Sequence, residues 1–306
     1  MKIFVSYGYV HALMLLAIIL AASSFPIGAA ITNDLPPAIL MFLRFLMAAL
    51  MFLPFVIAKY GLKIPSNSAL LCYTFLSFPL ITFFWCMFES LRYTSVLNTG
   101  ALYTLVPAIT AVYALIINRE FTSKSRIFWL LIGTVGALWV VFRGSFESFI
   151  SLDLNHGDLV FLVGCLFLGL YNPLIKRFYK GEPMVLMTFW VLLLGSVLLF
   201  LLSIPNIANI NWIDIENDVY LGVVYLSFFS TLITFFIINY STVRIGATKV
   251  SAYGFLTPLF VISISIVAGI DSFEFIIFPG MLLILSATIF IQRNDKYITN
   301  AIERDT

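Results

Sequence analysis

The feature that most constrains this chain is a succession of ten apolar runs, each about as long as a membrane is thick. The hydrocarbon core of a bilayer, about 30 Å thick, takes about 20 helical residues to cross. Strands of a membrane barrel would instead alternate in hydropathy over about 10 residues. We therefore predict an all-α membrane protein with ten transmembrane helices. The expected spans are residues 8–31, 36–57, 69–91, 95–117, 126–143, 157–176, 184–204, 218–241, 248–270 and 274–292.

Composition supports lipid as the solvent and excludes other classes of protein. Of 306 residues, 61% are hydrophobic and 10% are charged, whereas soluble domains carry about 25% charged residues. Fifteen acidic against seventeen basic residues leave no large basic face, so nucleic acid is not an expected partner. The expected partners are the lipid bilayer and a small-molecule substrate. A second copy of the chain, in a homodimer, is a further possible partner.

The basic residues predict the orientation of the spans. Fourteen of the 17 lysines and arginines fall on one side of the predicted membrane. Arg92 and Arg143 fall on the other side, and Arg44 lies within a span. Both termini are therefore expected in the cytoplasm, and the protein is expected as a multi-pass protein of the inner, cytoplasmic membrane.

No motif for catalysis, metal binding or nucleotide hydrolysis is found in the sequence. His-Glu-x-x-His, Gly-x-Ser-x-Gly and Gly-x-x-x-x-Gly-Lys are all absent. We expect no enzyme activity, no nucleotide hydrolysis, no metal and no cofactor. The cysteines and histidines also lack the spacing of a disulfide framework or a metal site. They are Cys72, Cys86, Cys165, His11 and His156.

The chain repeats itself at an offset of about 150 residues. The segment 94–107 can be laid on 245–258, which matches Pro107 with Pro258 and extends to Glu120 with Asp271. Residues 24–26 fall on 171–173, matching Pro26 with Pro173. We therefore expect one repeat over 1–150 and a second over 151–306, the latter including a short cytoplasmic tail.

Five spans per repeat is an odd number, so the second repeat is inserted in the opposite orientation. Inverted repeats of this kind build secondary transporters, whose site lies near the midplane between the halves. Interrupted helices at corresponding positions point to that site, and we predict such breaks at the two pairs of prolines. The alternative is that the prolines only kink helices for packing.

Several segments resemble the drug/metabolite transporter superfamily, in its EamA-like family, over roughly residues 8–292. The resemblance implies an alternating-access carrier with a central cavity, in two inverted five-helix repeats, that exports amino acids, other metabolites or drugs. Two segments depart from the family pattern, Ser23 to Pro26 and Gly269 to Asp271. The segments that carry the resemblance are Leu43 to Leu46, Leu91 to Ser95, Leu105 to Pro107, Asn118 to Glu120, Gly133 to Gly136, Gly157 to Leu159, Ile245 to Thr248 and Leu256 to Pro258.

Ionisable groups inside lipid are costly and are therefore candidates for function. Arg44 lies eight residues from Pro36, about 12 Å along the helix from its outer end. We hypothesise that Arg44 meets Glu89 in the outer half of the cavity and that they gate it, with Arg92 nearby. The alternatives are that Arg44 holds the bundle together and that Glu89 only pairs with Arg92 at the interface.

Polar and aromatic residues near midspan are candidates for lining the cavity. A wall of this kind, with few charges, suits a zwitterionic or partly apolar solute better than a multiply charged phosphate. Each side chain could instead bond only to a neighbouring helix. The candidates are Ser23, Ser24, Trp85, Tyr103, Tyr171, Asn172, Asn239, Tyr240 and Tyr253.

The sequence thus predicts a secondary transporter that exports amino acids or similar small metabolites. A drug-efflux carrier and a metabolite-uptake carrier of the same fold are the alternatives. An intramembrane enzyme and a channel are disfavoured by the missing motifs and by the inverted repeat.

Overall fold

The computed structural model of the chain describes residues 7–61, 64–94, 96–120, 123–145, 147, 150, 155–267, 269 and 274–293. Within these residues, ten helical spans are long and apolar enough to cross a membrane. They follow the expected spans closely, so the prediction of a multi-pass helical membrane protein is confirmed. Three expectations fall on residues outside the described part: the start of the second repeat at residue 151, the match of Asp271 with Glu120, and the C-terminal tail at 294–306.

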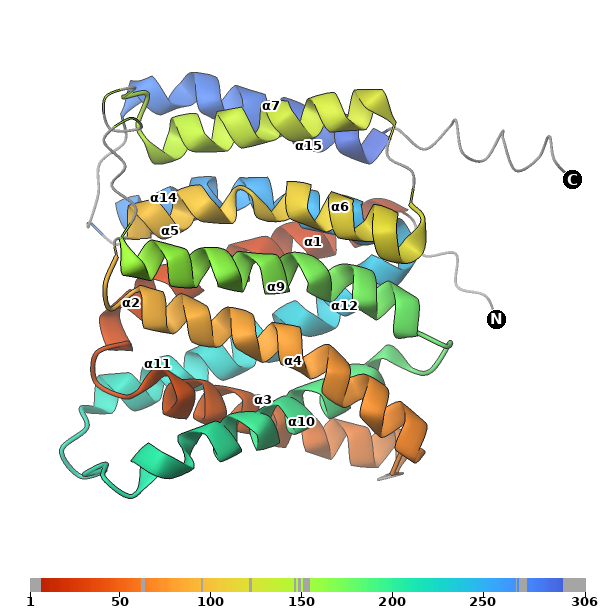
Figure 1. Cartoon of the computed structure of the whole chain (residues 1–306), viewed down its shortest axis with the longest axis vertical. Coiled ribbons are helices and arrows are strands. Elements are labelled where there is room, and N and C mark those ends of the chain that lie inside the picture. Colours follow the sequence, from red (N-terminus) through yellow and green to blue (C-terminus); the bar gives the residue numbers. More distant parts are fainter. Residues whose placement is uncertain are drawn as a thin grey trace, which may run out of the picture.

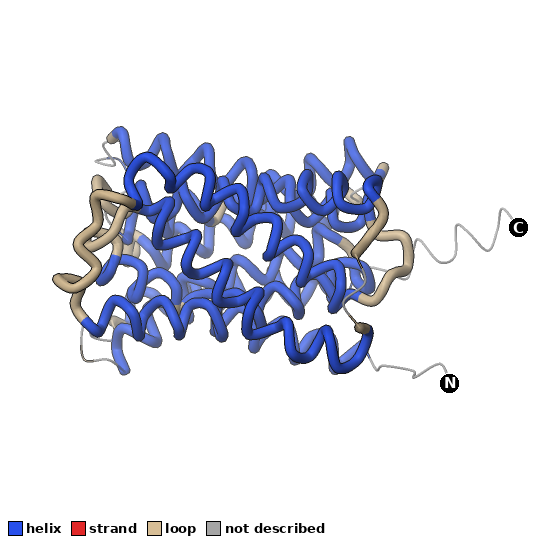
Figure 2. Tube along the Cα trace, turned by 90° about the horizontal axis from the view of Figure 1, so that it is seen from below, coloured by secondary structure: helices blue, strands red, loops and turns tan. Residues whose placement is uncertain are grey.

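The helices run along a common axis with their connecting loops at the two ends (Figures 1 and 2). The first half contains α1 (Tyr7–Ala22), α2 (Ser24–Ile31), α3 (Pro37–Tyr60), α4 (Asn67–Ser90), α5 (Val96–Tyr103), α6 (Val106–Asn118) and α7 (Lys124–Val141). The second half contains α9 (His156–Phe178), α10 (Met184–Ile207), α11 (Asn217–Ser227), the π-helix η1 (Phe228–Ile233), α12 (Thr234–Ile245), α13 (Ala247–Ala252), the 3₁₀ turns η2 (Tyr253–Leu256) and η3 (Phe275–Ile277), α14 (Thr257–Val267) and α15 (Phe278–Arg293).

The two halves interlock, because most spans pack mainly on spans of the other half. In the first half, α4 and α6 pack on α9, α3 packs on α10, and α7 packs on α15. Under the inversion, the contacts of the third and fourth spans with the sixth correspond to contacts of the eighth and ninth spans with the first. These contacts are also present, since α1 packs on both α12 and α14. The packing therefore follows the approximate two-fold relation between the repeats.

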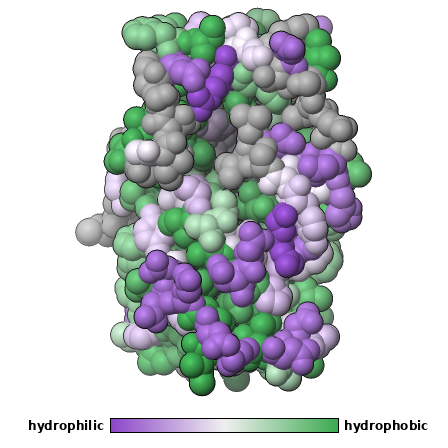
Figure 3. All heavy atoms as spheres, turned by 90° about the vertical axis from the view of Figure 1, so that its left-hand side faces the viewer, coloured by the Kyte–Doolittle hydropathy of each residue, from purple (hydrophilic) through white to green (hydrophobic). Residues whose placement is uncertain are grey.

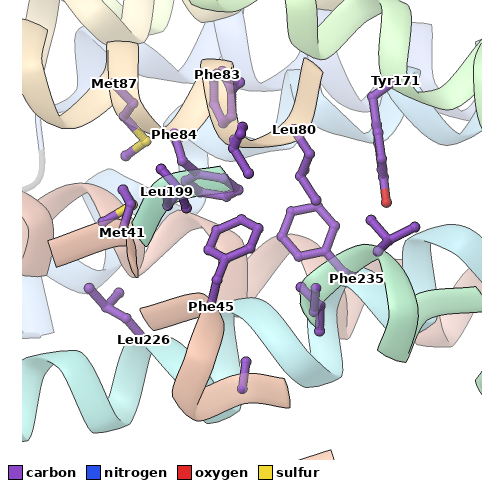
Figure 4. Packing of buried hydrophobic residues seen from close by; sticks show 14 of the residues in the cluster. Met41, Phe45, Leu80, Phe83, Phe84, Met87, Tyr171, Leu199, Leu226 and Phe235 are labelled. Atoms are coloured by element: carbon purple, nitrogen blue, oxygen red, sulfur yellow. The ribbon is translucent and has the colours of Figure 1, made fainter. Parts of the chain in front are cut away.

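Aromatic residues fill the interior where these helices meet (Figure 4). Phe84 of α4 lies edge to face with Phe45 of α3 at 5.8 Å and with Phe235 of α12 at 5.6 Å between ring centroids. Edge-to-face pairs at this distance are favourable for the ring quadrupoles. Three helices from both halves are joined in one core here.

The beginning of α9 is held by the buried carboxylate of Asp158. Its Oδ2 accepts hydrogen bonds from the backbone N–H of Asn155 at 3.0 Å and from Nδ2 of Asn98 at 3.2 Å. Its Oδ1 accepts a hydrogen bond from the hydroxyl of Thr94 at 2.5 Å. The side chain of Asn155 accepts a hydrogen bond from the backbone N–H of Asp158 in return, which completes a capping box. The carboxylate also ties α9 to Thr94 and to Asn98 of α5.

The two helices α7 and α15 approach each other at glycines. A methyl group on Gly280 would lie 2.7 Å from the backbone oxygen of Gly136. Such close approach is usual where membrane helices pack through small residues. These two spans close one side of the bundle (Figure 1).

The surface separates into apolar sides and polar ends. Large side chains such as Leu71, Ile116 and Leu221 are 65–71% exposed on the sides, where lipid is the solvent. Hydrophilic residues gather on the end of the bundle at which α9 and α11 begin (Figure 3). This distribution fits a protein that spans a membrane along the helix axis.

Candidate functional site

The first span is interrupted next to Pro26. Helix α1 ends at Ala22 and α2 begins at Ser24, so the break falls at Ser23. Proline lacks the backbone N–H that would bond to the carbonyl four residues earlier, which is that of Ala22. The hydroxyl of Ser23 donates to the backbone oxygen of Leu20 at 2.7 Å.

The fourth and ninth spans are interrupted at corresponding positions. Helix α5 ends at Tyr103, and Pro107 is the second residue of α6. In the ninth span, the 3₁₀ turn η2 separates α13 from α14, whose second residue is Pro258. The two interruptions also meet, because a methyl group on Gly254 would lie 3.4 Å from Cε1 of Tyr103 and 3.8 Å from Cγ of Pro107.

Pro173 does not interrupt its helix, contrary to the expectation from Pro26. Helix α9 is continuous from His156 to Phe178. Close packing of α6 supports the helix at this point, since a methyl group on Gly169 would lie 2.5 Å from Cγ2 of Ile109. The backbone oxygen of Pro173 accepts a hydrogen bond from Nδ2 of Asn118 of the same neighbour, at 3.1 Å.

Arg44 of α3 lies completely buried where the broken first span meets the eighth span. Its Nε donates to the hydroxyl of Thr231 at 2.6 Å. Its Nη2 donates to the backbone oxygen of Ser230 at 3.1 Å and to the hydroxyl of Ser24 at 3.5 Å. Its Nη1 has no hydrogen-bond partner among the residues that the structure describes. The guanidinium also lies over the ring of Phe84, 4.3 Å from the centroid.

The π-helix η1 supplies two of the three hydrogen-bond partners of Arg44, Thr231 and Ser230, and was not predicted from the sequence. Single π-turns within α-helices are rare and often mark functional sites. The hydroxyl of Ser230 lies 3.3 Å from that of Ser23, to which the hydroxyl of Tyr225 donates at 3.1 Å. A signal was present in the run of hydroxyl residues that includes Ser227, Ser230, Thr231 and Thr234.

Arg44 and Glu89 are not brought together as hypothesised. The carboxylate of Glu89 pairs with Arg92 at 3.4 Å, three residues further along the chain. Their side chains are 19% and 36% exposed, respectively. The reason is the orientation of α4 about its own axis. Glu89 lies on the partly exposed face of α4, whereas its neighbour Phe88 is fully buried and faces Arg44.

Trp85 lies on the same face of α4, which points outward. Leu71, Phe75 and Phe78 precede it at helical spacing and are 51–71% exposed, and Trp85 itself is partly exposed. Residues three and four apart share a face of a helix. Trp85 is therefore placed towards lipid rather than between the two halves, contrary to the expectation that it lines the cavity.

Three of the expected lining residues lie around α9 and α12. The hydroxyl of Tyr171 donates to Oδ1 of Asn239 at 3.0 Å, and Nδ2 of Asn239 donates to the hydroxyl of Thr188 at 3.0 Å. This buried chain of hydrogen bonds connects α9, α12 and α10. Asn172 is also buried, and no described residue forms a hydrogen bond to its Oδ1.

The remaining two expected lining residues contact groups nearer the ends of their helices. The hydroxyl of Tyr253, in the 3₁₀ turn η2, lies 2.5 Å from Nδ1 of His11 in α1. The ring of Tyr240 lies under the guanidinium of Arg244, 3.4 Å from centroid to Cζ. His11 was not among the predicted site residues, because a single histidine near the end of a span carries no pattern.

The described residues contain no group of three or more His, Cys, Asp or Glu side chains able to hold a metal ion. The arrangement around Arg44 instead offers one cation, several hydroxyl groups and aromatic rings in an apolar interior. Chemically it can bind an anionic or polar group of a small molecule.

Comparisons with known proteins agree with this architecture. YyaM, an uncharacterized transporter of Bacillus subtilis (strain 168), is 28% identical over 198 residues, and the chain covers 65% of its length, just under two thirds. An uncharacterized transporter of Archaeoglobus fulgidus is 24% identical over 251 residues, which are 82% of this chain and 86% of that protein. A crystal structure with 16% identity shares the fold, with a TM-score of 0.76 over 95% of this chain and all of the other.

The family comparison covers most of the sequence. A model of the EamA-like transporter family matches it twice, at residues 8–142 and 155–293. This chain therefore belongs to the EamA-like transporter family.

Proposed function

We propose that this protein is a secondary carrier of the inner membrane that exports amino acids or similar small metabolites by alternating access. Residues 1–150 and 151–306 form its two halves, and the solute passes between them. Both termini face the cytoplasm, as the uneven distribution of lysine and arginine supports.

One observation carries the proposal, namely the paired interruption of the fourth and ninth spans. Interrupted helices at corresponding positions of inverted repeats are typical of transporter sites near the membrane midplane. Here the two breaks face each other, with Tyr103 against Gly254. Irregular backbone at membrane depth is tolerated where protein or a water-filled path surrounds it.

The chemistry of the interior supports a small solute with few charges. Among the described groups near the breaks are hydroxyls and aromatic rings, and the guanidinium of Arg44 lies beside the break in the first span. A zwitterion such as an amino acid offers one carboxylate to a guanidinium and an apolar side chain to aromatic rings. This match favours amino acids and comparable metabolites as solutes.

Untargeted metabolite profiling of spent medium tests the proposal. Cells that express the wild type are compared with vector controls and with the variants Tyr103→Ala and Phe78→Ala at equal membrane abundance. We expect enrichment of one or more amino acids or small metabolites with the wild type and with Phe78→Ala, because Phe78 faces lipid. Tyr103→Ala should lose most of the enrichment, because its ring contacts the break in the ninth span.

Counterflow in membrane vesicles provides the second measurement. A carrier exchanges labelled for unlabelled solute through a saturable site, whereas a channel does not. Accumulation inside cells, rather than in the medium, would show uptake instead of export. If the wild type is present in the membrane and neither assay shows movement of a solute, the proposed function is refuted.

A further inference from the structure

The charge of Arg44 is not balanced by an acidic side chain among the residues that the structure describes. Its guanidinium is completely buried, and Arg44 lies in the first half of α3. A buried charge without a countercharge destabilises a membrane protein, and such groups are usually retained for function. The ion pairs between described residues lie elsewhere: Glu89–Arg92, Glu120–Lys176 and Glu274–Arg143.

The guanidinium also has hydrogen-bonding capacity that is not used. Of its five N–H groups, the one on Nε is bound by Thr231 and those on Nη2 face Ser230 and Ser24. Both N–H groups on Nη1 lack an acceptor within the described part of the chain. The contact with Ser24, at 3.5 Å, is long enough to be replaced by a better acceptor. The edge formed by Nη1 and Nη2 therefore carries donors that a ligand could use.

The surroundings of this edge suit an anionic group on an otherwise apolar molecule. The hydroxyl of Ser24 lies beside it and can donate to a second oxygen atom, whereas those of Ser23 and Ser230 already donate to the backbone oxygen of Leu20. The rings of Phe84 and Phe88 lie on the guanidinium, 4.3 and 6.0 Å from Cζ to the centroids. The break in the first span and the π-helix η1 converge at the same place.

We infer that Arg44 binds the carboxylate of the transported solute through the Nη1–Nη2 edge. The inference rests on the proposed function and narrows its substrates to molecules that carry one carboxylate. Two parallel N–H···O bonds are the preferred geometry between a guanidinium and a carboxylate. A phosphate dianion would need further cations, and the other buried basic side chains of the described part, Arg126 and Lys249, lie in the first turns of their helices.

The test compares ligands that differ only in the carboxylate. Purified protein in detergent is titrated with the common L-amino acids and with their α-carboxamides, and binding is read from the rise in melting temperature. We expect at least one amino acid to bind the wild type, and its amide to bind about tenfold more weakly or worse, which corresponds to about 1.4 kcal/mol.

Variants of Arg44 locate the effect at the proposed site. Arg44→Gln should lose about tenfold or more in affinity for the amino acid and little for the amide. Arg44→Lys should fall between the two, because it keeps the charge and loses the planar fork. It also carries the test if Arg44→Gln does not fold. Arg177→Gln, at an exposed position near the end of α9, is the matched control and should bind as the wild type.

The outcomes separate this inference from the proposed function. Equal binding of amino acid and amide, or unchanged affinity in Arg44→Gln, would overturn the role of Arg44 while leaving a carrier. Export by the wild type of solutes that all lack a carboxylate would do the same. Absence of both binding and export by a folded wild type would refute the proposed function and the inference with it.

Discussion

Replacement of Asp158 offers a sharp check on how the beginning of α9 is held. The carboxylate accepts three hydrogen bonds, two at Oδ2 and one at Oδ1. In Asp158→Asn, the amide oxygen can take the place of Oδ2 and keep the bonds from Asn155 and Asn98. The amide nitrogen then faces Thr94, whose hydroxyl can accept as well as donate. All three bonds persist, and only their charge assistance is lost.

The magnitudes follow from this geometry. Hydrogen bonds to charged groups contribute about 1 kcal/mol more than neutral ones, and three of them are affected. Part of this loss is offset because an ionised group is no longer buried. We expect a net cost of about 1 kcal/mol for Asp158→Asn. In Asp158→Leu all three bonds and the capping box are lost, at about 1 kcal/mol or more each.

The assay is thermal unfolding of the purified protein, followed by size-exclusion of the remaining folded fraction. At roughly 2 °C per kcal/mol for a chain of this size, Asp158→Asn should lower the midpoint by about 2 °C and Asp158→Leu by about 6 °C. Asp214→Asn, in an exposed loop, is the control and should change nothing. If Asp158→Asn destabilises as much as Asp158→Leu, the charge itself holds the helix and the hydrogen-bond argument is wrong.

Three further predictions test other parts of the structure. Trp85→Ala should leave transport near the wild-type rate in vesicles, because the indole faces lipid; a large loss would place it in the solute path. Gly280→Ala should lower the melting temperature by about 2–6 °C, since overpacking costs about 1–3 kcal/mol and the new methyl would lie 2.7 Å from a backbone oxygen of α7. Gly100→Ala, with its nearest neighbour at 3.7 Å, should be tolerated, and equal effects of the two would contradict the packing. Asn239→Leu should destabilise the protein more than Tyr171→Phe in the same melting assay. It breaks two buried hydrogen bonds rather than one, and each contributes about 0.6–1.7 kcal/mol. The reverse order would rule out the hydrogen-bond chain.

The sequence by itself determined the number and approximate limits of the spans. Lipid offers no hydrogen bonds to the backbone, so each crossing must be a helix of about 20 apolar residues, and that length is visible in the sequence. Proline removes a hydrogen-bond donor wherever it stands, and Pro26, Pro107 and Pro258 lie next to the three breaks. Proline alone does not decide where a helix breaks, because α3, α4 and α10 are continuous through Pro54, Pro79 and Pro205.

The tertiary structure decided which faces of the helices meet. In a membrane protein both lipid and core are apolar, so hydropathy does not show which side of a helix points inward. Trp85 and Phe88 look alike in the sequence, yet one faces lipid and the other lies against Arg44. Helix α9 likewise stays continuous at Pro173 because a neighbouring helix packs against it there.

The partners of Arg44 show the same limit most clearly. Its shortest hydrogen bond is to Thr231, 187 positions away in the sequence, in the π-helix η1. That contact exists because the second half is inserted in the opposite orientation and its eighth span packs on α3. The sequence could single out a charged residue in lipid, but only the packing of the two halves determines what surrounds it.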